Sequence, residues 1–272
     1  MNISPFRRLR LFLLLPAQVL VFIIFCPAAM AWQFYTGHNI SEINSGLVIL
    51  EPDNWSRKDL MTLKSQGRKT FAWLNLTQIE ENRIVPFDIR EKDYILSGKY
   101  RPENKRVAVF YHQSFRRLVL GRLREYLLKG FSGVVLTKTG AYNQISNSPI
   151  NRSEMWKLIT FLAEDALKII PEAEVIIHDG ESFWSEIQKS SLISGVLVEG
   201  VFYGPRGRQI KPWEREKKLN SIKRLLESGK RVFIAEDART EKRQKHVRNE
   251  AARLNLLAEF VNLPLMIEER KK

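Results

Sequence analysis

The 272-residue sequence contains a single cysteine, Cys26, and only four histidines. Since Cys26 lies in an apolar N-terminal stretch, the remainder of the chain has no cysteine for a disulfide or for thiol chemistry. No two histidines have the His-x-x-x-His spacing of a zinc site, and we expect neither a metal nor a cofactor. The sequence also has no Gly-x-Gly-x-x-Gly fingerprint and no Gly-x-Ser-x-Gly elbow, which argues against dinucleotide binding and serine hydrolysis.

The first 31 residues have the pattern of a secretory signal peptide. A basic start with three arginines and no acid is followed by a nearly unbroken apolar stretch over 11–26. Ala29-Met30-Ala31 then matches the small-x-small pattern of a cleavage site. We predict that the signal is removed, leaving no transmembrane segment, and that the protein is exported to the periplasm or the extracellular space. An uncleaved anchor is the alternative, because 11–31 is close to the ~20 residues that a bilayer requires.

Positive charge is in excess: 44 lysines and arginines face 30 acids, a formal net charge of +14. Loss of the three N-terminal arginines leaves about +11 on residues 32–272. Such a surface is either simply solvated or suited to anionic envelope polymers and lipid headgroups. A basic helix at 240–255 is a candidate for that contact. Because no basic stretch accompanies a recognised nucleic-acid-binding motif, we do not expect nucleic acid as a partner.

Residues 32–272 alternate short apolar runs with amphipathic helical patterns. Runs of four to eight branched and aromatic residues are typical of strands buried on both faces. They are 47–50, 70–76, 107–112, 133–137, 174–178, 195–199, 231–236 and 260–267. Helical patterns occupy 56–66, 114–129, 152–170 (with a cap near Asn151), 213–228 and 240–257. This alternation predicts one (β/α)8 barrel domain, a fold of about 250 residues. A doubly wound open sheet is the alternative, because Pro264 interrupts the last run.

Acidic residues cluster where the predicted strands end. In a (β/α)8 barrel these ends meet at one mouth, where active sites lie. Paired carboxylates there suit glycoside hydrolysis, in which one stays protonated to donate to the leaving oxygen and the other is ionised. Aromatic side chains at the same mouth could stack on sugar rings. The acids at these ends are Glu51, Asp53, Glu80, Asp179, Glu199, Glu236 and Asp237.

Four segments resemble the endo-α-1,4-polygalactosaminidase-like glycoside hydrolases, a family of (β/α)8 barrels. They are ILEPDNWSRKDLMTLKSQGRKTFAWLNLTQIEE (49–81), GFSGVVLTKTGAY (130–142), VLVEGVFYG (196–204) and RVFIAED (231–237). Their order is that of the family, and they span nearly all of 32–272. The resemblance implies an endo-acting barrel with an amino-sugar polysaccharide as substrate. It also implies that Glu199 is the best-preserved functional acid of the family and that Glu236 is the second best preserved.

The sequence departs from this family at its acidic positions. Thr137, which cannot ionise, stands where the family carries an aspartate on strand four, and the cation Lys138 follows it. Gln78 replaces the first glutamate of the second strand, although Glu80 remains. His178-Asp179 occupies a position where the family tends to have Gln-Asn.

Two functions are compatible with these departures. The first is a hydrolase that uses Glu199 with Asp179 or Glu236 as a relocated partner. The second, which the loss of two family acids favours, is a barrel that only binds polysaccharide or a protein; an ion pair between Lys138 and Glu199 would support it. Because a basic protein repels cationic polygalactosamine, we expect a neutral N-acetylated or an anionic amino-sugar polymer. The expected substrate-binding residues are Asp53, Glu80, Tyr142 and Tyr203.

Overall fold

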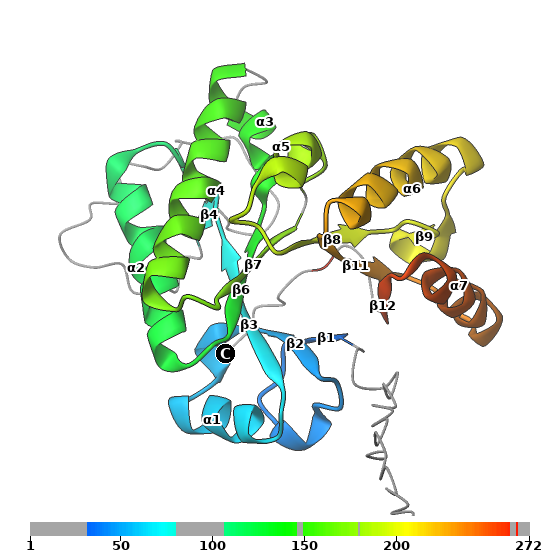
Figure 1. Cartoon of the computed structure of the whole chain (residues 1–272), viewed down its shortest axis with the longest axis horizontal. Helices are drawn as coiled ribbons and strands as arrows, with labels where there is room; N and C mark the ends of the chain where they lie inside the picture. Colours follow the sequence, from blue (N-terminus) through cyan, green and yellow to red (C-terminus); the bar gives the residue numbers. More distant parts are fainter. Residues whose placement is uncertain (1–31, 80–105, 146–148, 179, 262–264, 266–272) are drawn as a thin grey trace, which may run out of the picture.

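A computed structural model describes residues 32–79, 106–145, 149–178, 180–261 and 265 of the protein. Its centre is an eight-stranded sheet in the order β1-β2-β3-β6-β7-β8-β11-β12, and every neighbouring pair is parallel (Figure 1). The strands are β1 (Trp32–Tyr35), β2 (Leu47–Leu50), β3 (Lys69–Asn75), β6 (Gly133–Thr137), β7 (Glu174–His178), β8 (Gly195–Glu199), β11 (Arg231–Glu236) and β12 (Leu257–Phe260).

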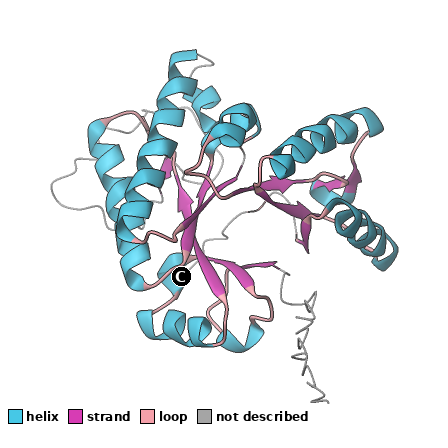
Figure 2. Cartoon of the chain, in the orientation of Figure 1, coloured by secondary structure: helices cyan, strands magenta, loops and turns pink. Residues whose placement is uncertain are grey.

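Helices connect the strands on the outside of this sheet, as the cyan and magenta elements of Figure 2 show. They are α1 (Arg57–Ser65), α2 (Gln113–Lys129), α3 (Tyr142–Ile145), α4 (Pro149–Ile169), α5 (Trp184–Lys189), α6 (Pro212–Glu227) and α7 (Glu241–Leu254). Two small antiparallel pairs lie in the connections: β4 (Gln78–Ile79) with β5 (Arg106–Val107), and β9 (Tyr203–Gly204) with β10 (Arg208–Gln209).

The two outer strands, β1 and β12, meet and nearly close the sheet into a barrel. Trp32 at the start of β1 is fully buried, and its Nε1 donates to the Leu257 carbonyl of β12 at 2.9 Å. The strand order follows the chain without reversal, whereas a doubly wound sheet reverses its order at a switch point. The structure therefore has the predicted (β/α)8 barrel architecture rather than the open-sheet alternative.

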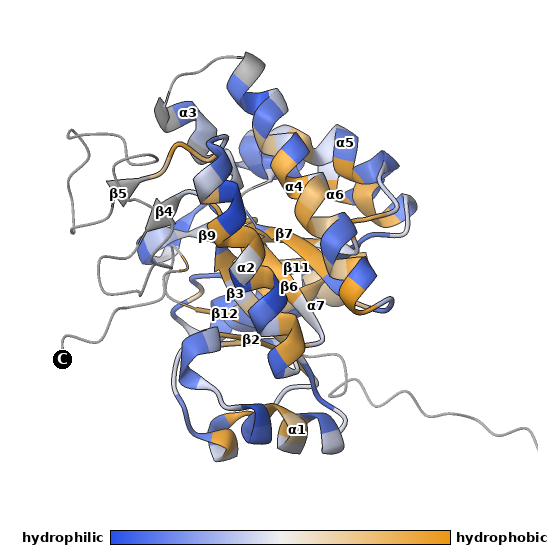
Figure 3. Cartoon of the chain, turned by 90° about the vertical axis from the view of Figure 1, so that its left-hand side faces the viewer, coloured by the Kyte–Doolittle hydropathy of each residue, from blue (hydrophilic) through white to orange (hydrophobic). Residues whose placement is uncertain are grey.

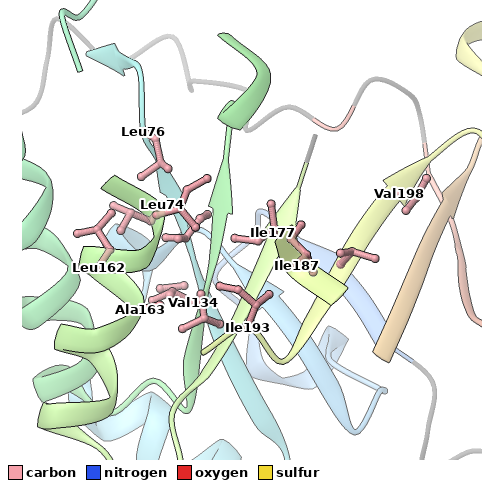
Figure 4. Packing of buried hydrophobic residues seen from close by; sticks show 14 of the residues in the cluster. Leu74, Leu76, Val134, Leu162, Ala163, Ile177, Ile187, Ile193 and Val198 are labelled. Carbon is pink, nitrogen blue, oxygen red and sulfur yellow. The ribbon is translucent and has the colours of Figure 1, made fainter. Parts of the chain in front are cut away.

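The core consists of two apolar layers separated by the strands, because alternate residues of a strand point to opposite faces. The inner layer fills the barrel and includes Trp32, Phe71 and Phe233. The outer layer lies between sheet and helices; Figure 4 shows Leu74 of β3 beside Leu162 of α4, and Ile177 of β7 beside Ile187 of α5. Figure 3 shows the same division by hydropathy, with apolar strands such as β7 and β11 and polar outward helix surfaces.

Five strands occupy the ranges predicted from their apolar runs, namely β2, β6, β7, β8 and β11. Helix α1 begins as predicted at Ser56, whose hydroxyl accepts from the Asp59 backbone N–H, while the Asp59 carboxylate accepts from the Ser56 N–H. This reciprocal capping box satisfies two N–H groups that a helix start leaves without partners.

The predicted third strand, 107–112, is wrong. Only Arg106–Val107 is a strand, and it pairs with β4 outside the barrel. Phe110 is buried in the outer apolar layer, and His112 caps α2 by accepting from the Ser114 N–H at 3.3 Å. The apolar run therefore leads into helix α2 and does not form a barrel strand. The eighth strand of the barrel is β1, which was not predicted from the sequence.

The boundaries of three other elements need correction. The last strand is β12 (Leu257–Phe260), where the sequence pattern predicts a helix until 257 and a strand over 260–267. Helix α7 ends earlier because Asn255 adopts a left-handed conformation at φ 55° and caps it. Helix α4 starts at Pro149, so the predicted cap Asn151 lies inside it. Within the described residues, no helix is long and apolar enough to cross a membrane.

Candidate active site

Three side chains from adjacent strands form a row of hydrogen bonds at the C-terminal end of the barrel. Thr137 ends β6, His178 ends β7 and Glu199 ends β8. The Thr137 hydroxyl lies 2.8 Å from His178 Nδ1, and His178 Nε2 lies 2.9 Å from Glu199 Oε1. A second contact joins the first two strands, because the Thr139 hydroxyl donates to the His178 carbonyl at 2.8 Å. The row is therefore held by backbone as well as by side chains.

The carboxylate of Glu199 indicates which atoms donate and which accept in these hydrogen bonds. Glu199 Oε1 also accepts from the Leu265 N–H at 2.8 Å, so that this oxygen has two donors around it. An ionised carboxylate only accepts, which assigns the proton of the imidazole to Nε2 of His178. Nδ1 is then an acceptor, and the Thr137 hydroxyl donates to it. A neutral His178 satisfies both neighbours in this arrangement.

The row passes from the interior to the surface. Thr137 and His178 are buried, whereas 17% of the Glu199 side chain is exposed. Trp73 of β3 packs against the His178 ring at 5.0 Å between centroids, and Phe34 of β1 packs on Trp73 at 5.1 Å. Aromatic rings thus cover the imidazole, and Glu199 is the member of the row that a ligand can reach.

Glu236 has a different environment, although it ends the neighbouring strand β11. It is fully buried, and its carboxylate accepts from the backbone N–H groups of Val201, Phe202 and Tyr203 at 2.7–3.1 Å. Burial raises the pKa of Glu236 to about 7, against the opposing effect of these three N–H groups and of Lys218. The geometry is that of a carboxylate that holds the connection after β8, not of an acid exposed to a substrate.

Helix α6 reaches the same strand end through Lys218. Its ammonium donates to the carbonyls of Glu199 and Gly200 at 3.0 and 3.1 Å. Gly200 has φ 58°, a left-handed conformation that glycine adopts without strain, so the chain turns sharply after β8. Glu236 and Lys218 therefore fix this turn from two sides, and with it the backbone of Glu199.

The structure does not bring the other predicted site residues into this row. Tyr142 is buried against Phe183 at 5.6 Å, and Tyr203 is buried below the guanidinium of Arg243. Asp53 is exposed, and it accepts from the Tyr126 hydroxyl of α2 at 3.4 Å.

Two predicted site residues, Glu80 and Asp179, lie outside the described residues. Among the described residues Glu199 pairs with His178 and not with Lys138, so the ion pair that would have supported a binding function is not found there. Lys138 itself has φ 60°, a left-handed conformation that is uncommon outside glycine.

Sequence reasoning missed two residues of this site, Lys218 and Leu265, and it considered Trp73 only as one of several aromatic residues that could stack on a sugar ring. His178 was identified only as a polar residue at a strand end, and its pattern offers no signal for its two partners. The described residues contain no group of three or more His, Cys, Asp or Glu side chains arranged to hold a metal ion.

Comparison with known proteins gives structural but not sequence matches. No protein-family model and no curated protein matches the chain. The glycoside hydrolase domain of PelA from Pseudomonas aeruginosa has a similar structure, with a TM-score of 0.70 and 18% identity over 87% of this chain and 95% of that one. Aspergillus fumigatus Ega3, in a complex with galactosamine, gives a TM-score of 0.68 at 14% identity, over 87% and 92% of the two chains.

A more distant structure is TtGalA, the alpha-galactosidase from Thermus thermophilus. Its TM-score is 0.56 at 12% identity, and the match covers 85% of this chain and 57% of that one. At such identities the likeness shows the fold. The barrel that the sequence resemblance implied is therefore confirmed, and it is a fold that glycoside hydrolases use.

Proposed function

We propose that the barrel binds an amino-sugar polysaccharide at the mouth around Glu199 and does not cleave it through paired carboxylates. The observation that carries this proposal is the hydrogen bond between Thr137 and His178. Thr137 stands where the family it resembles has an aspartate, and its hydroxyl occupies the imidazole nitrogen that a carboxylate would otherwise face. Similarity to the PelA hydrolase domain and to Ega3, solved with galactosamine, supports a sugar ligand.

Glycoside hydrolysis by the usual route needs two carboxyl groups about 5 to 9.5 Å apart, on either side of the scissile bond. Glu199 is available as one of them, since its side chain is partly exposed. Glu236 does not fit as the second, because it is fully buried and holds three backbone N–H groups. A threonine cannot replace it, because a hydroxyl neither carries the charge nor takes up the proton.

The charge of the protein bears on which polymer it binds. With about +11 on residues 32–272, the surface repels a polymer of free galactosamine and admits an N-acetylated or acidic one. The predicted signal peptide places this encounter in the periplasm or outside the cell.

A hydrolase is the second candidate, favoured by the partial exposure of Glu199 beside an imidazole. In that case Glu199 is the acid or base of the reaction, and Asp179, the residue after His178, is its partner. The two candidates differ in one measurable respect, the appearance of new reducing ends.

Affinity electrophoresis in gels that contain N-acetylated, deacetylated or uronic-acid polymers tests both candidates, together with an assay of reducing ends. We expect retardation by the N-acetylated polymer without new reducing ends. Glu199→Gln should reduce this retardation, whereas Glu227→Gln, an exposed glutamate of α6, should not. Reducing ends that vanish in Glu199→Gln would establish the hydrolase instead, and no retardation in any gel would refute both.

A further inference from the structure

Positive charge is concentrated in one part of the chain, the basic segment (residues 205–253). It contains sixteen lysines and arginines but only seven acids, a net charge of +9 out of +14 for the whole sequence. The segment forms α6, β11 and α7, which lie together on one side of the molecule (Figure 1). This asymmetry is not required for the barrel, because the strands and inner helix faces are apolar.

The outer face of α6 carries an open groove of about 500 Å³, which we name the α6 groove. Its residues recur every three or four positions, as residues on one face of a helix do. They are Trp213, Glu216, Lys217, Asn220, Ser221 and Arg224. Trp213 is 65% exposed, which is unusual for so large an apolar side chain.

The cations of the groove are available to a ligand. Lys217 and Arg224 are both exposed, and neither forms an ion pair within the described residues. Lys218, the next residue, points the opposite way and donates to the backbone of Glu199 and Gly200. The helix therefore separates the α6 groove from the barrel mouth, and the two are distinct sites.

We propose that the α6 groove binds an acidic polysaccharide, one that carries carboxylates on its sugar rings. The Trp213 ring supplies a flat apolar face for a sugar ring, as aromatic side chains do at interfaces that are partly wet. Lys217 and Arg224 pair with ring carboxylates in charge-assisted hydrogen bonds. Asn220 and Ser221 add neutral groups that hydrogen-bond to hydroxyls.

An anionic membrane surface is the competing ligand, and the distribution of apolar residues argues against it. Helices that lie in a membrane interface bury an apolar face that contains several large side chains. Among the described residues, Trp213 is the one exposed large apolar side chain of α6 and α7. A single aromatic ring between polar neighbours suits a sugar polymer better than a lipid bilayer.

Polygalacturonate and its methyl ester are matched probes, because they share a backbone and differ in charge. We expect the purified protein to bind polygalacturonate and to bind the ester at least tenfold more weakly, about the loss of one charge-assisted hydrogen bond. The double variant Lys217→Gln/Arg224→Gln should weaken binding about tenfold or more, and Trp213→Ala should do so roughly tenfold. Melting curves identical to that of the unmodified protein should accompany both changes, since the three side chains are exposed.

The control variant is Lys58→Gln/Lys64→Gln, which removes two exposed charges from α1 on another part of the barrel. If it weakens binding as much as the groove variant, the attraction is a general effect of net charge and the proposal is overturned. Binding to phosphatidylglycerol vesicles, sensitive to the groove variant, without binding to polygalacturonate would also overturn it. Glu199→Gln should leave binding at the groove unchanged, which separates this proposal from the function of the mouth.

Discussion

A single hydroxyl, that of Thr137, stands at the end of strand β6 where the family that the sequence resembles has an aspartate. The Thr137 hydroxyl can donate to Nδ1 of His178, an arrangement that suits a neutral imidazole whose single N–H, on Nε2, is directed at Glu199. A carboxylate in the same place would accept from Nδ1 and favour a doubly protonated, cationic ring. Two acids on neighbouring strands would then flank one imidazolium, and the proton that His178 shares with Glu199 would be held between them.

Thr137→Asp should therefore produce hydrolysis, which we do not expect from the unmodified protein. We expect release of reducing ends from N-acetylated polymer to rise about a hundredfold over background, the lower range of what a placed acid or base contributes. Thr137→Asn, which has nearly the same size and no charge, is the control and should gain nothing. If the aspartate variant keeps its fold and its polymer binding but releases no ends, Thr137 is not what blocks the reaction.

Glu236 should make stability depend on pH near neutrality. Burial raises its pKa from 4.5 to about 7, so that between these values the folded protein binds a proton that the unfolded chain does not. The stabilisation is present below pH 4.5 and is lost as the pH rises through about 7, with a slope of up to about 1.4 kcal/mol per pH unit. Denaturant unfolding of the protein and of Glu236→Gln at several pH values measures this. The free energy of unfolding of the unmodified protein, minus that of Glu236→Gln, should fall as the pH rises from 4.5 to about 7.

That difference is informative because a second glutamate titrates in the same range. Burial raises the pKa of Glu259 to about 7 as well, but Glu259 is present in both proteins and cancels. A difference in free energy that is constant from pH 4.5 to 8 would contradict the role of Glu236.

At the scale of helices and strands, Lys218 joins α6 to the end of β8. Removing its ammonium in Lys218→Met leaves two carbonyls near Glu199 without their donor, and we expect a loss of about 1–3 kcal/mol in the free energy of unfolding. Lys217→Met changes the neighbouring, outward-facing lysine and should stay within about 0.5 kcal/mol. Thermal and denaturant unfolding of both variants checks this, and equal losses would show that Lys218 contributes no more than a surface lysine.

Much of the barrel can be predicted from the sequence, because its central strands are continuous apolar runs bounded by glycine or polar residues. The run at 107–112 has the same appearance and is not a barrel strand. Its apolar residue Phe110 is buried in the layer between sheet and helices, which removes it from water as well as a strand would. Strand β1 was missed because it directly follows the apolar N-terminal stretch, which hides its own pattern.

The site could be predicted only in part. The position of Glu199 at a strand end is evident from the sequence, but Glu236 has the same kind of position and is buried below three N–H groups. Which of two such acids faces solvent depends on how the following chain folds over it. Likewise, Lys217 and Lys218 of α6 face opposite ways, and which of them faces the barrel depends on how the helix is rotated about its axis where it packs on the sheet.

At the scale of the whole molecule, the barrel depends on the contact between its first and last strands. Trp32 is fully buried, packs edge-on against Phe233 at 5.9 Å and donates to Leu257 of β12 at 2.9 Å. It is also the first residue after the predicted cleavage site. The export signal would thus end immediately before the residue that closes the barrel, with no spacer between them.

Trp32→Ala should destabilise the protein by about 3–5 kcal/mol, because it leaves a large cavity and removes the hydrogen bond between the outer strands. Trp213→Ala makes the same chemical change at an exposed position and should cost within about 0.5 kcal/mol. Denaturant unfolding measures both, and hydrogen exchange should show β1 and β12 losing protection before the central strands. Equal losses in the two variants would mean that the contact between β1 and β12 contributes little, and that the eight strands hold the fold without closure of the barrel.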